Sequence, residues 1–582
     1  MKKNPKVSIV IPVYKGKDYV KEAIDSALNQ SYKNIEIIVV NDGSEDNDAT
    51  RNIALSYGDK IRYFEKENGG VSTALNLAIE NMTGDYFSWL SHDDRYYKNK
   101  VADQIKALKK YDDNTILYSD YDLMDENSNV FANSIKDHDE LINKPEYALL
   151  RGAINGITLL IPKEAFKECG LFREDLRCTQ DYELWSRMMK KYKFIHEPGI
   201  LATTRLHKNQ TGNISPRVAI ENNELWLDLI ESISDKRKIE LEKSIYNYYF
   251  QMREFIKTTN FDKVLEYLNN KIDILDKEIK NEEESTLISV IIPFYENIKE
   301  LKRALDSVMK QTHKKLEIIV IDDGENEQLN IKLQDFRNIK LIKNKSNKGV
   351  SYSRNIGMKN AKGQYIAFLD SDDEFMPEKI EKQLIFMLKN NADFSFTSYI
   401  RKSKVEIPID CSYNPKFLKL KCMSNCSIAT PTVMIKKVLL EKYNLKYIEN
   451  IKYGEDVIFY LNNFKYTEPL CLNEYLTIVN SDENSAYLDI QKQIEGTKNI
   501  LAYILTDDEY KSQNNEIAKL CYGLYAFIKP DMNEFNRVQN NDVSLTNTQY
   551  IKQSKIKKCY NTFKNKGLVY CIKRFFKRMI GK

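Results

Sequence analysis

The sequence predicts an α/β protein with two similar Rossmann-like domains in tandem, each built on a mostly parallel sheet. Three observations predict it: a long internal repeat, strand–helix–strand alternation inside each copy, and a charged helical stretch after each copy. The chain has 582 residues, which is more than one hydrophobic core can organise, so several domains are expected.

The repeat consists of four sequence blocks that recur in the same order. The first two pairs, offset by 281 residues, are VSIVIPVY (7–14) with ISVIIPFY (288–295) and EIIVVNDG (36–43) with EIIVIDDG (317–324). The next two pairs, offset by 279 residues, are GGVSTALNLA (69–78) with KGVSYSRNIG (348–357) and GDYFSWLSHDD (84–94) with GQYIAFLDSDD (363–373). Matched blocks with one small slip indicate a duplicated domain of roughly 200 residues.

Within the first copy, residues 7–13 are β-branched and nearly all apolar, which is typical of a buried parallel strand. Residues 17–29 carry apolar side chains at helical spacing, and residues 36–40 form the next expected strand, ended by Asn41-Asp42-Gly43. This order predicts a βαβ unit, whose ligands bind at the carboxyl ends of the strands.

Helical, charge-rich stretches follow both copies. Residues 215–284 contain neither proline nor glycine after Pro216, and a second helical stretch begins near residue 488. We therefore expect an N-terminal domain, a helical connector, a second domain and a helical C-terminal region, with these bounds: 1–214, 215–285, 286–487 and 488–582.

Composition and charge exclude several classes of function. Hydrophobic residues make up 42% and charged residues 30%, which is ordinary for a globular protein. The net charge is +4, yet residues 551–582 hold eleven Lys/Arg and no Asp/Glu, so the rest sums to −7. A generic nucleic-acid binder is not expected from a mildly acidic body.

The tail suggests a different partner. Residues 568–580 (LVYCIKRFFKRMI) place apolar side chains on one face of a helix and four basic ones largely on the other. Such a helix suits an anionic membrane surface, and the alternative is that it packs on the acidic body of the protein. No apolar run is long enough to span a bilayer, residues 1–14 are too short for a signal peptide, and the nine cysteines are scattered. We expect reduced cytosolic thiols and a cytoplasmic protein, peripheral at the inner face of the membrane if the tail binds there.

Polar and aromatic residues stand where the predicted strands end. The ring of Tyr14 could stack on a nucleobase, and Asp42 could accept hydrogen bonds from a base edge. Asp93 and Asp94 repel each other unless a cation joins them, and such oxygen ligands suit Mg²⁺ or Mn²⁺ bridging a diphosphate. Paired aspartates also solvate ordinary turns, but recurrence of the pair at 372–373 favours the site.

A further carboxylate precedes an amphipathic helix in each copy. Asp181, in TQDYELW, could act as general base toward an acceptor hydroxyl, or simply cap the helix. Asp456, in YGEDVIFYL, takes the matching place in the second copy. His207 lies 26 residues beyond Asp181, and Asp482 lies 26 beyond Asp456, so both could face a metal or diphosphate.

Both copies resemble family 2 glycosyltransferases with the GT-A fold. The resemblance rests on S-[IV]-[IV]-I-P-x-Y, the [ND]-D-G turn, G-V-S with a following Asn, a strand ending in a DXD-type cluster, and the later [QE]-D. It covers about 7–210 and 288–485 and implies inverting transfer from a nucleotide-diphosphate sugar, most simply a UDP-sugar, with Mn²⁺ or Mg²⁺ as cofactor. It implies these roles: Asp181 and Asp456 as catalytic bases; Pro12, Tyr14, Asp42, Asp93, Pro293, Tyr295, Asp323, Arg354 and Asp372 in nucleotide-sugar binding; and Asp94, His207, Asp373 and Asp482 at the metal.

The copies also depart from each other and from the family pattern. Ser91 stands where the second copy has Asp370, and Leu75 where it has Arg354, so the two donors or their phosphate contacts could differ. The Q-x-x-R-W motif and membrane helices of processive members are missing. The expected function is a bifunctional transferase acting on a surface glycan, glycolipid or glycoprotein. The alternatives are one catalytic copy with a non-catalytic binding or scaffolding copy, or a soluble polymerase alternating two sugars.

Overall fold

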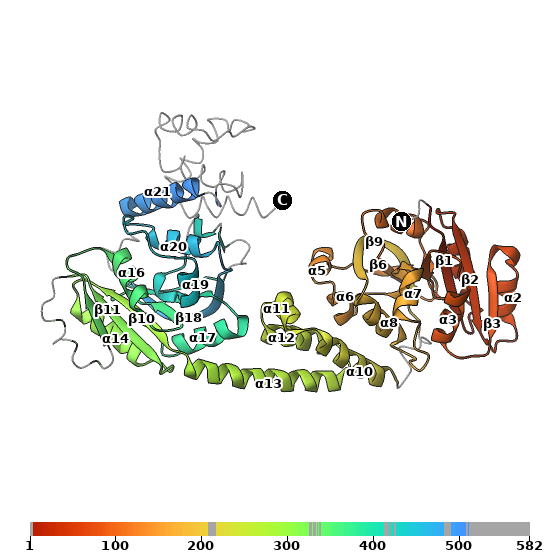
Figure 1. Ribbon diagram of the computed structural model, residues 1–582, viewed down its shortest axis with the longest axis horizontal. Helices are drawn as coiled ribbons and strands as arrows, with labels where there is room; N and C mark the ends of the chain where they lie inside the picture. The colour runs from red at the N-terminus through yellow and green to blue at the C-terminus, as the bar shows by residue number, and fades with distance from the viewer. Residues whose placement is uncertain are drawn as a thin grey trace, which may run out of the picture. The chain divides into compact units, whose positions relative to one another are not determined.

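A computed structural model describes residues 4–207, 217–324, 329, 333, 336, 339–412, 418–419, 421–423, 426–481, 490–507 and 510. The chain divides into two compact units, Met1–Asp276 and Lys277–Lys582. Both have the α/β organisation that the repeat predicted, with parallel strands at the heart of each sheet (Figure 1).

The first unit contains a five-stranded sheet in the order β3-β2-β1-β4-β8. All but β8 run parallel. Alternate side chains of β1 enter different cores: Ile9 and Ile11 pack with helix α1, and Val10 packs with α3. The bounds are β1 (Val7–Val13), α1 (Val20–Leu28), β2 (Ile35–Asp42), α2 (Ala49–Leu55), β3 (Arg62–Lys66), α3 (Val71–Asn81), β4 (Tyr86–Trp89) and β8 (Ile161–Pro162).

A second sheet of the first unit has the order β5-β9-β6-β7, and β6 runs parallel to β9. An isolated bridge between Leu117 and Leu160 links it to the first sheet. The bounds are β5 (Arg95–Tyr96), α4 (Lys100–Leu108), β6 (Thr115–Met124), β7 (Val130–Ser134), α5 (His138–Asn143), α6 (Tyr147–Leu150), α7 (Lys163–Cys169), α8 (Gln180–Met189) and β9 (Lys193–Arg205).

The second unit repeats this plan, but its strands form one nine-stranded sheet because β17 pairs with both β13 and β15. The order is β12-β11-β10-β13-β17-β15-β18-β14, with β16 paired to β15. The bounds are β10 (Ile288–Phe294), α14 (Ile298–Met309), β11 (Leu316–Asp322), β12 (Ile339–Lys343), α16 (Val350–Asn360), β13 (Tyr365–Phe368), β14 (Glu374–Phe375), α17 (Lys379–Asn390), β15 (Phe394–Lys402), β16 (Glu406–Ile409), β17 (Met434–Lys436), α19 (Lys437–Lys442), α20 (Glu455–Asn463) and β18 (Leu470–Asn480).

The helix that follows each copy packs on that copy. Helix α10 (Arg217–Ser232) buries Trp226 and Ile230 in the core of the first unit, together with parts of α11 (Asp235–Glu242) and α12 (Ile245–Ile256). Helix α21 (Ile490–Thr506) lies on α20, where Gly496 meets Gly454. The connector therefore belongs to the compact first unit up to Asp276.

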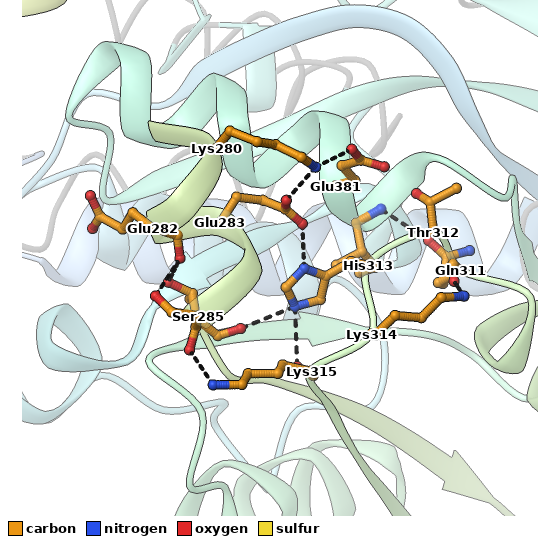
Figure 2. Close-up of polar contacts among 12 residues, drawn as sticks. Lys280, Glu282, Glu283, Ser285, Gln311, Thr312, His313, Lys314, Lys315 and Glu381 are labelled. Atoms are coloured by element: carbon orange, nitrogen blue, oxygen red, sulfur yellow. Dashed lines mark hydrogen bonds and ion pairs between the residues drawn. The ribbon is translucent and has the colours of Figure 1, made fainter. Parts of the chain in front are cut away.

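Helix α13 (Asp262–Ser285) is one uninterrupted helix (Figure 1). Its end is fastened to the second unit by buried polar contacts, which Figure 2 shows. The Nδ1 atom of His313 lies 2.5 Å from Glu283, and its Nε2 atom lies 3.0 and 3.1 Å from the carbonyl oxygens of Thr286 and Lys315. Both ring nitrogens thus face oxygen acceptors in a buried setting, which fixes the helix end against the start of β11.

Candidate functional site

The candidate site of each unit lies at the carboxyl edge of its parallel strands. In the first unit β1 lies between β2 and β4, so the segments after these three strands meet at one edge. In the second unit β10 lies between β11 and β13 in the same way. The order in which successive strands are added to the sheet reverses at these points. Open α/β sheets bind ligands there.

The residues at the end of the first strand divide into buried and exposed groups. Pro12 and Pro293 are buried within β1 and β10, so their rings shape the strand rather than face solvent. Tyr14 and Tyr295 follow the strands and are 39% and 49% exposed. Both tyrosine rings are therefore accessible to a planar ligand such as a nucleobase.

Asp42 and Asp323 use both carboxylate oxygens to hold the loop before the next helix. Asp42 accepts from the backbone N–H groups of Gly69 at 3.0 Å and Gly70 at 2.8 Å, and pairs with Lys66 at 2.8 Å. Asp323 accepts from the N–H of Gly349 at 2.6 Å. Gly70 and Gly349 adopt φ of 94° and 88°, which L side chains rarely adopt. These aspartates thus shape the loop, whatever base contacts they make in addition.

The two adjacent aspartates of the first unit face different ways. Asp93 Oδ2 lies 3.0 Å from His207 Nε2. Asp94 is buried and accepts from the backbone N–H of Arg205 at 2.8 Å. Burial, together with the charge of Asp93, raises the pKa of Asp94 well above its usual range. Asp93 and His207 thus form a polar pair, while the Asp94 side chain anchors the loop; the expected roles of these residues at a metal or diphosphate stay predictions.

The second unit anchors its acidic loop by the same device. Asp373 accepts from the backbone N–H of Asn480 at 2.8 Å, as Asp94 does from Arg205. The Asn480 side chain donates to the Asp372 carbonyl at 2.7 Å. Asp372 itself is exposed beside the Asp370 carboxylate. Asp482, expected at the metal, lies outside the described residues.

Arg205 was not among the residues expected from the sequence. Its guanidinium is fully buried and donates through Nε to the Asp93 carbonyl at 2.9 Å and through Nη2 to Glu22 at 2.6 Å. The residue therefore ties the acidic loop to α1. Its position two residues before His207, matched by Asn480 two before Asp482, is the only sequence signal that could have indicated this role.

The residues present could supply part of the coordination shell of a divalent cation. In the described part of the chain, no group of three or more His, Cys, Asp or Glu residues is placed to hold a metal by itself. Asp93 and His207 offer two ligands from neighbouring segments. Mg²⁺ and related ions commonly bind one or two protein ligands and complete their shell with substrate phosphates and water. Two protein ligands alone would leave such a shell incomplete.

The candidate bases occupy equivalent helix positions. Asp181 and Asp456 are the second residues of α8 and α20, and each accepts from the N–H of the next residue, at 2.8 and 2.7 Å. Thr179 stands at the N-cap of α8, so Asp181 is not the cap. Burial raises the pKa of Asp181 to about 6 and also raises that of Asp456. A carboxylate in this range is ionised near neutral pH and basic enough to take a proton.

Glu221 on α10 holds the segment that leads to Asp181. Its buried carboxylate accepts from the backbone N–H groups of Arg177 at 3.1 Å, Cys178 at 2.8 Å and Thr179 at 3.2 Å, and from the Thr179 hydroxyl at 3.3 Å. In the second unit Gly496 of α21 instead packs on Gly454. No sequence pattern predicted this contact, because the acceptor comes from a helix assigned to the connector.

The second unit has an ionic group that the first lacks. Arg354 Nη2 lies 2.7 Å from Asp370 Oδ1, and its Nη1 lies 3.3 Å from Glu455 Oε1. Burial, reinforced by the neighbouring Asp456, raises the pKa of Glu455 to about 7. The predicted residues Arg354, Asp370 and Asp456 thus share one electrostatic environment.

Comparisons with known proteins agree with this arrangement. The family model described as glycosyl transferase family 2 matches residues 8–161 and 289–435. A protein named uncharacterized glycosyltransferase from Rickettsia felis is 41% identical over 514 residues, covering 86% of this chain and 84% of that protein. A Rickettsia conorii relative of the same description is 42% identical, covering 86% and 83%.

Two further similarities are more partial. The Escherichia coli protein named UDP-Glc:alpha-D-GlcNAc-diphosphoundecaprenol beta-1,3-glucosyltransferase WfgD is 34% identical over 29% of this chain and 67% of its own length. The crystal structure of S. aureus TarS shares 21% identity, covers 41% of this chain and 43% of that one, and has a TM-score of 0.34.

The fold and the family match together define an enzyme that transfers sugars. The chain belongs to glycosyl transferase family 2 and contains two segments of that family. It is a glycosyltransferase, as the resemblance in its sequence implied. No helix among the described residues is long and apolar enough to cross a bilayer.

Proposed function

We propose that this protein is a bifunctional, inverting glycosyltransferase with one active site in each unit. Each site takes a sugar from a nucleotide-diphosphate donor, most simply a UDP-sugar, and passes it to a surface glycan, glycolipid or glycoprotein. The catalytic domains are residues 1–214 and 286–487, followed by the connector 215–285 and the C-terminal region 488–582. One observation carries the proposal: both units present the same three features, namely an exposed tyrosine, an anchored acidic loop and a partly buried carboxylate at a helix start.

The donor fits the carboxyl edge of the sheet. We assign the exposed Tyr14 and Tyr295 to the base, and Asp93 and Asp372 to the diphosphate. Asp93 with His207 would hold a divalent cation in the first site, and Asp372 with Asp482 in the second. The cation, when bound, neutralises charge that develops on the leaving diphosphate.

The protein's own groups then carry the proton and set the geometry. Asp181 or Asp456 takes the proton of an acceptor hydroxyl. The acceptor oxygen then attacks the anomeric carbon from the side opposite the diphosphate. One bond to the acceptor oxygen forms as the bond to the diphosphate oxygen breaks, so the anomeric configuration inverts. Glu221 positions the segment before Asp181 through its hydrogen bonds to residues 177–179.

The WfgD relative supports a UDP-sugar donor and a lipid-linked acceptor, since its name describes transfer from UDP-Glc to a diphosphoundecaprenol-linked sugar. We propose that the protein is cytoplasmic and contacts the membrane peripherally through residues 568–580, which lie outside the described residues. A soluble polymerase that alternates two sugars is a special case of the same two-site proposal.

Hydrolysis of donors by the full chain tests the proposal. Wild type, Asp181→Asn and Asp456→Asn are incubated with Mn²⁺ and each of UDP-glucose, UDP-galactose, UDP-GlcNAc, UDP-glucuronic acid and GDP-mannose, and released nucleotide is measured. We expect wild-type turnover to fall in each single variant and to vanish in the double variant. Full wild-type turnover in one of the single variants would mean that the corresponding unit only binds or scaffolds.

A further inference from the structure

The acidic loop of each unit is held by an arginine side chain that bonds the same backbone carbonyl. In the first unit, Arg205 at the end of β9 donates through Nε to the Asp93 carbonyl at 2.9 Å. In the second unit, Arg303 in the middle of α14 donates through Nη2 to the Asp372 carbonyl at 2.6 Å. Asp93 and Asp372 correspond in the repeat. The two units therefore make the same contact from different elements.

An ion pair beside each acidic loop keeps its place but reverses its polarity. In the first unit, Glu22 of α1 pairs with Arg95 of β5 at 2.9 Å. In the second unit, Arg303 and Glu374 take the matching positions of α14 and β14, and Arg303 Nε lies 3.0 Å from Glu374 Oε1. Exchanging one member alone would set two like charges against each other, so an interaction that is needed in both units predicts a joint exchange. Arg303 thus takes the place of Glu22 and adds the carbonyl contact, which a carboxylate cannot donate.

The length of the neighbouring hairpin explains why the arginine changes place. Arg205 is fully buried, and its Nη1 donates to three acceptors in the turn between β6 and β7, namely the Asp125 carbonyl at 3.0 Å, the Glu126 carbonyl at 3.2 Å and the Ser128 hydroxyl at 3.0 Å. That turn covers residues 125–129, whereas the matching turn between β15 and β16 covers only 403–405. A guanidinium buried beside the shorter turn would lose these acceptors, and unsatisfied buried donors are costly. Asn480 stands there instead, and the arginine comes from α14.

We propose that Arg303 is a positioning residue of the second site, which fixes the acidic loop through the Asp372 carbonyl, and that its exposure makes this loop loosen with salt while the loop of the first site does not. The carbonyl belongs to the peptide that joins Asp372 to Asp373, so a donor on it sets the direction of both carboxylates. The Arg303 side chain is 42% exposed, whereas that of Arg205 is 0% exposed. Salt screens exposed ion pairs strongly and buried ones much less. The inference rests on the proposed function, in which these carboxylates meet the cation and the diphosphate.

Hydrogen exchange of the two acidic loops tests the inference without donor or cation. Peptides covering 369–376 and 90–97 are followed in the full chain at about 50 and about 500 mM KCl. We expect salt to speed exchange in the second loop about threefold relative to the first loop. Arg303→Gln should show the faster exchange at both salt concentrations, while Lys310→Gln, at an exposed position at the end of the same helix, should behave as the wild type. A salt response that is the same in the wild type and in Arg303→Gln would overturn the inference.

A charge exchange separates the carbonyl contact from the ion pair. The double variant Arg303→Glu, Glu374→Arg rebuilds the polarity of the first unit but leaves position 303 without a donor for the Asp372 carbonyl. We expect its second loop to exchange as fast as that of Arg303→Gln. Wild-type protection in the double variant would show that the ion pair alone holds the loop, and would overturn the role of the carbonyl contact.

Turnover then shows whether the loop positions the site. In the Asp181→Asn background, which reports the second site, the Mn²⁺ concentration for half-maximal turnover is measured with a donor that the site hydrolyses. We expect Arg303→Gln to raise this concentration about threefold with kcat at saturating Mn²⁺ nearly unchanged, because the loop is loosened only while the cation is absent. An unchanged Mn²⁺ dependence would overturn the positioning role. A second site that turns over no donor would contradict the proposed function instead, and the exchange measurements would still decide the role of Arg303.

Discussion

Replacing Glu221 tests whether a helix outside the expected catalytic domain positions the first base. Glu221→Gln keeps the size of the side chain but replaces one accepting oxygen by an amide that faces backbone N–H groups. The four hydrogen bonds to residues 177–179 involve a charged acceptor, and such bonds contribute about 1.5–3 kcal/mol each to stability. If about 2–3 kcal/mol of this appears in the transition state, the turnover number of the first site falls about 30–160-fold.

The assay uses the Asp456→Asn background, so that only the first site reports. Donor turnover is measured over a range of donor concentrations, and we expect a loss in kcat with a nearly constant KM, because the base moves while the donor contacts stay. Glu224→Gln on the same helix, at an exposed position, is the matched control. Equal kcat values for Glu221→Gln and this control would refute the positioning role, as would an equal loss at the second site in the Asp181→Asn background.

Three further outcomes follow from the geometry. Lys379 is buried, its Nζ has no hydrogen-bond partner among the described residues, and burial lowers its pKa to about 7. Between pH 7 and the ordinary lysine pKa the unfolded chain binds more protons than the folded one, so the stability of the wild type should rise with pH. In chemical denaturation, Lys379→Met should be more stable than the wild type by roughly 4 kcal/mol at pH 7 and by progressively less toward pH 10. A gain in stability that does not change with pH would contradict this. Asp93→Asn and His207→Ala should change how the activity of the first site depends on Mn²⁺ and Mg²⁺ concentration, whereas Asp94→Asn should mainly lower the thermal stability of the protein. The reverse pattern would support Asp94 as the metal ligand. Truncation after Tyr550 should release the protein from vesicles of phosphatidylcholine with phosphatidylglycerol, and equal binding with and without the tail would rule out the membrane role.

Much of the fold could be predicted from the sequence because the repeat and the strand patterns are local signals. The buried run at 7–13 matches β1, and the strand expected at 36–40 lies inside β2. The prediction that polar residues after neighbouring strands gather at one edge also holds in the sheet order. Periodicity carries this information because every side chain of a buried parallel strand faces a core.

The missing parts depend on contacts between distant segments. Glu221 contacts residues more than forty positions away in the sequence. Arg205 joins the acidic loop to Glu22, which lies 183 positions earlier. The sequence does show that Arg354 and Asp370 each differ from their counterparts, but not that a guanidinium joins them to Glu455. Residue spacing gives the register of a strand, whereas the partner of a buried charge is set by packing. The tail at 568–580 and Asp482 lie outside the described residues and stay predictions.

The central claim is that the chain holds two separate catalytic sites, and sugar addition to an acceptor tests it most directly. Wild type, Asp181→Asn, Asp456→Asn and the double variant are given GlcNAc-diphospholipid acceptor with the nucleotide sugars that each site hydrolyses, and products are weighed by mass spectrometry. We expect each single variant to lack a different sugar addition, and the double variant to make none. Full product at the wild-type rate from one of the single variants would show that the corresponding unit is not a catalytic site.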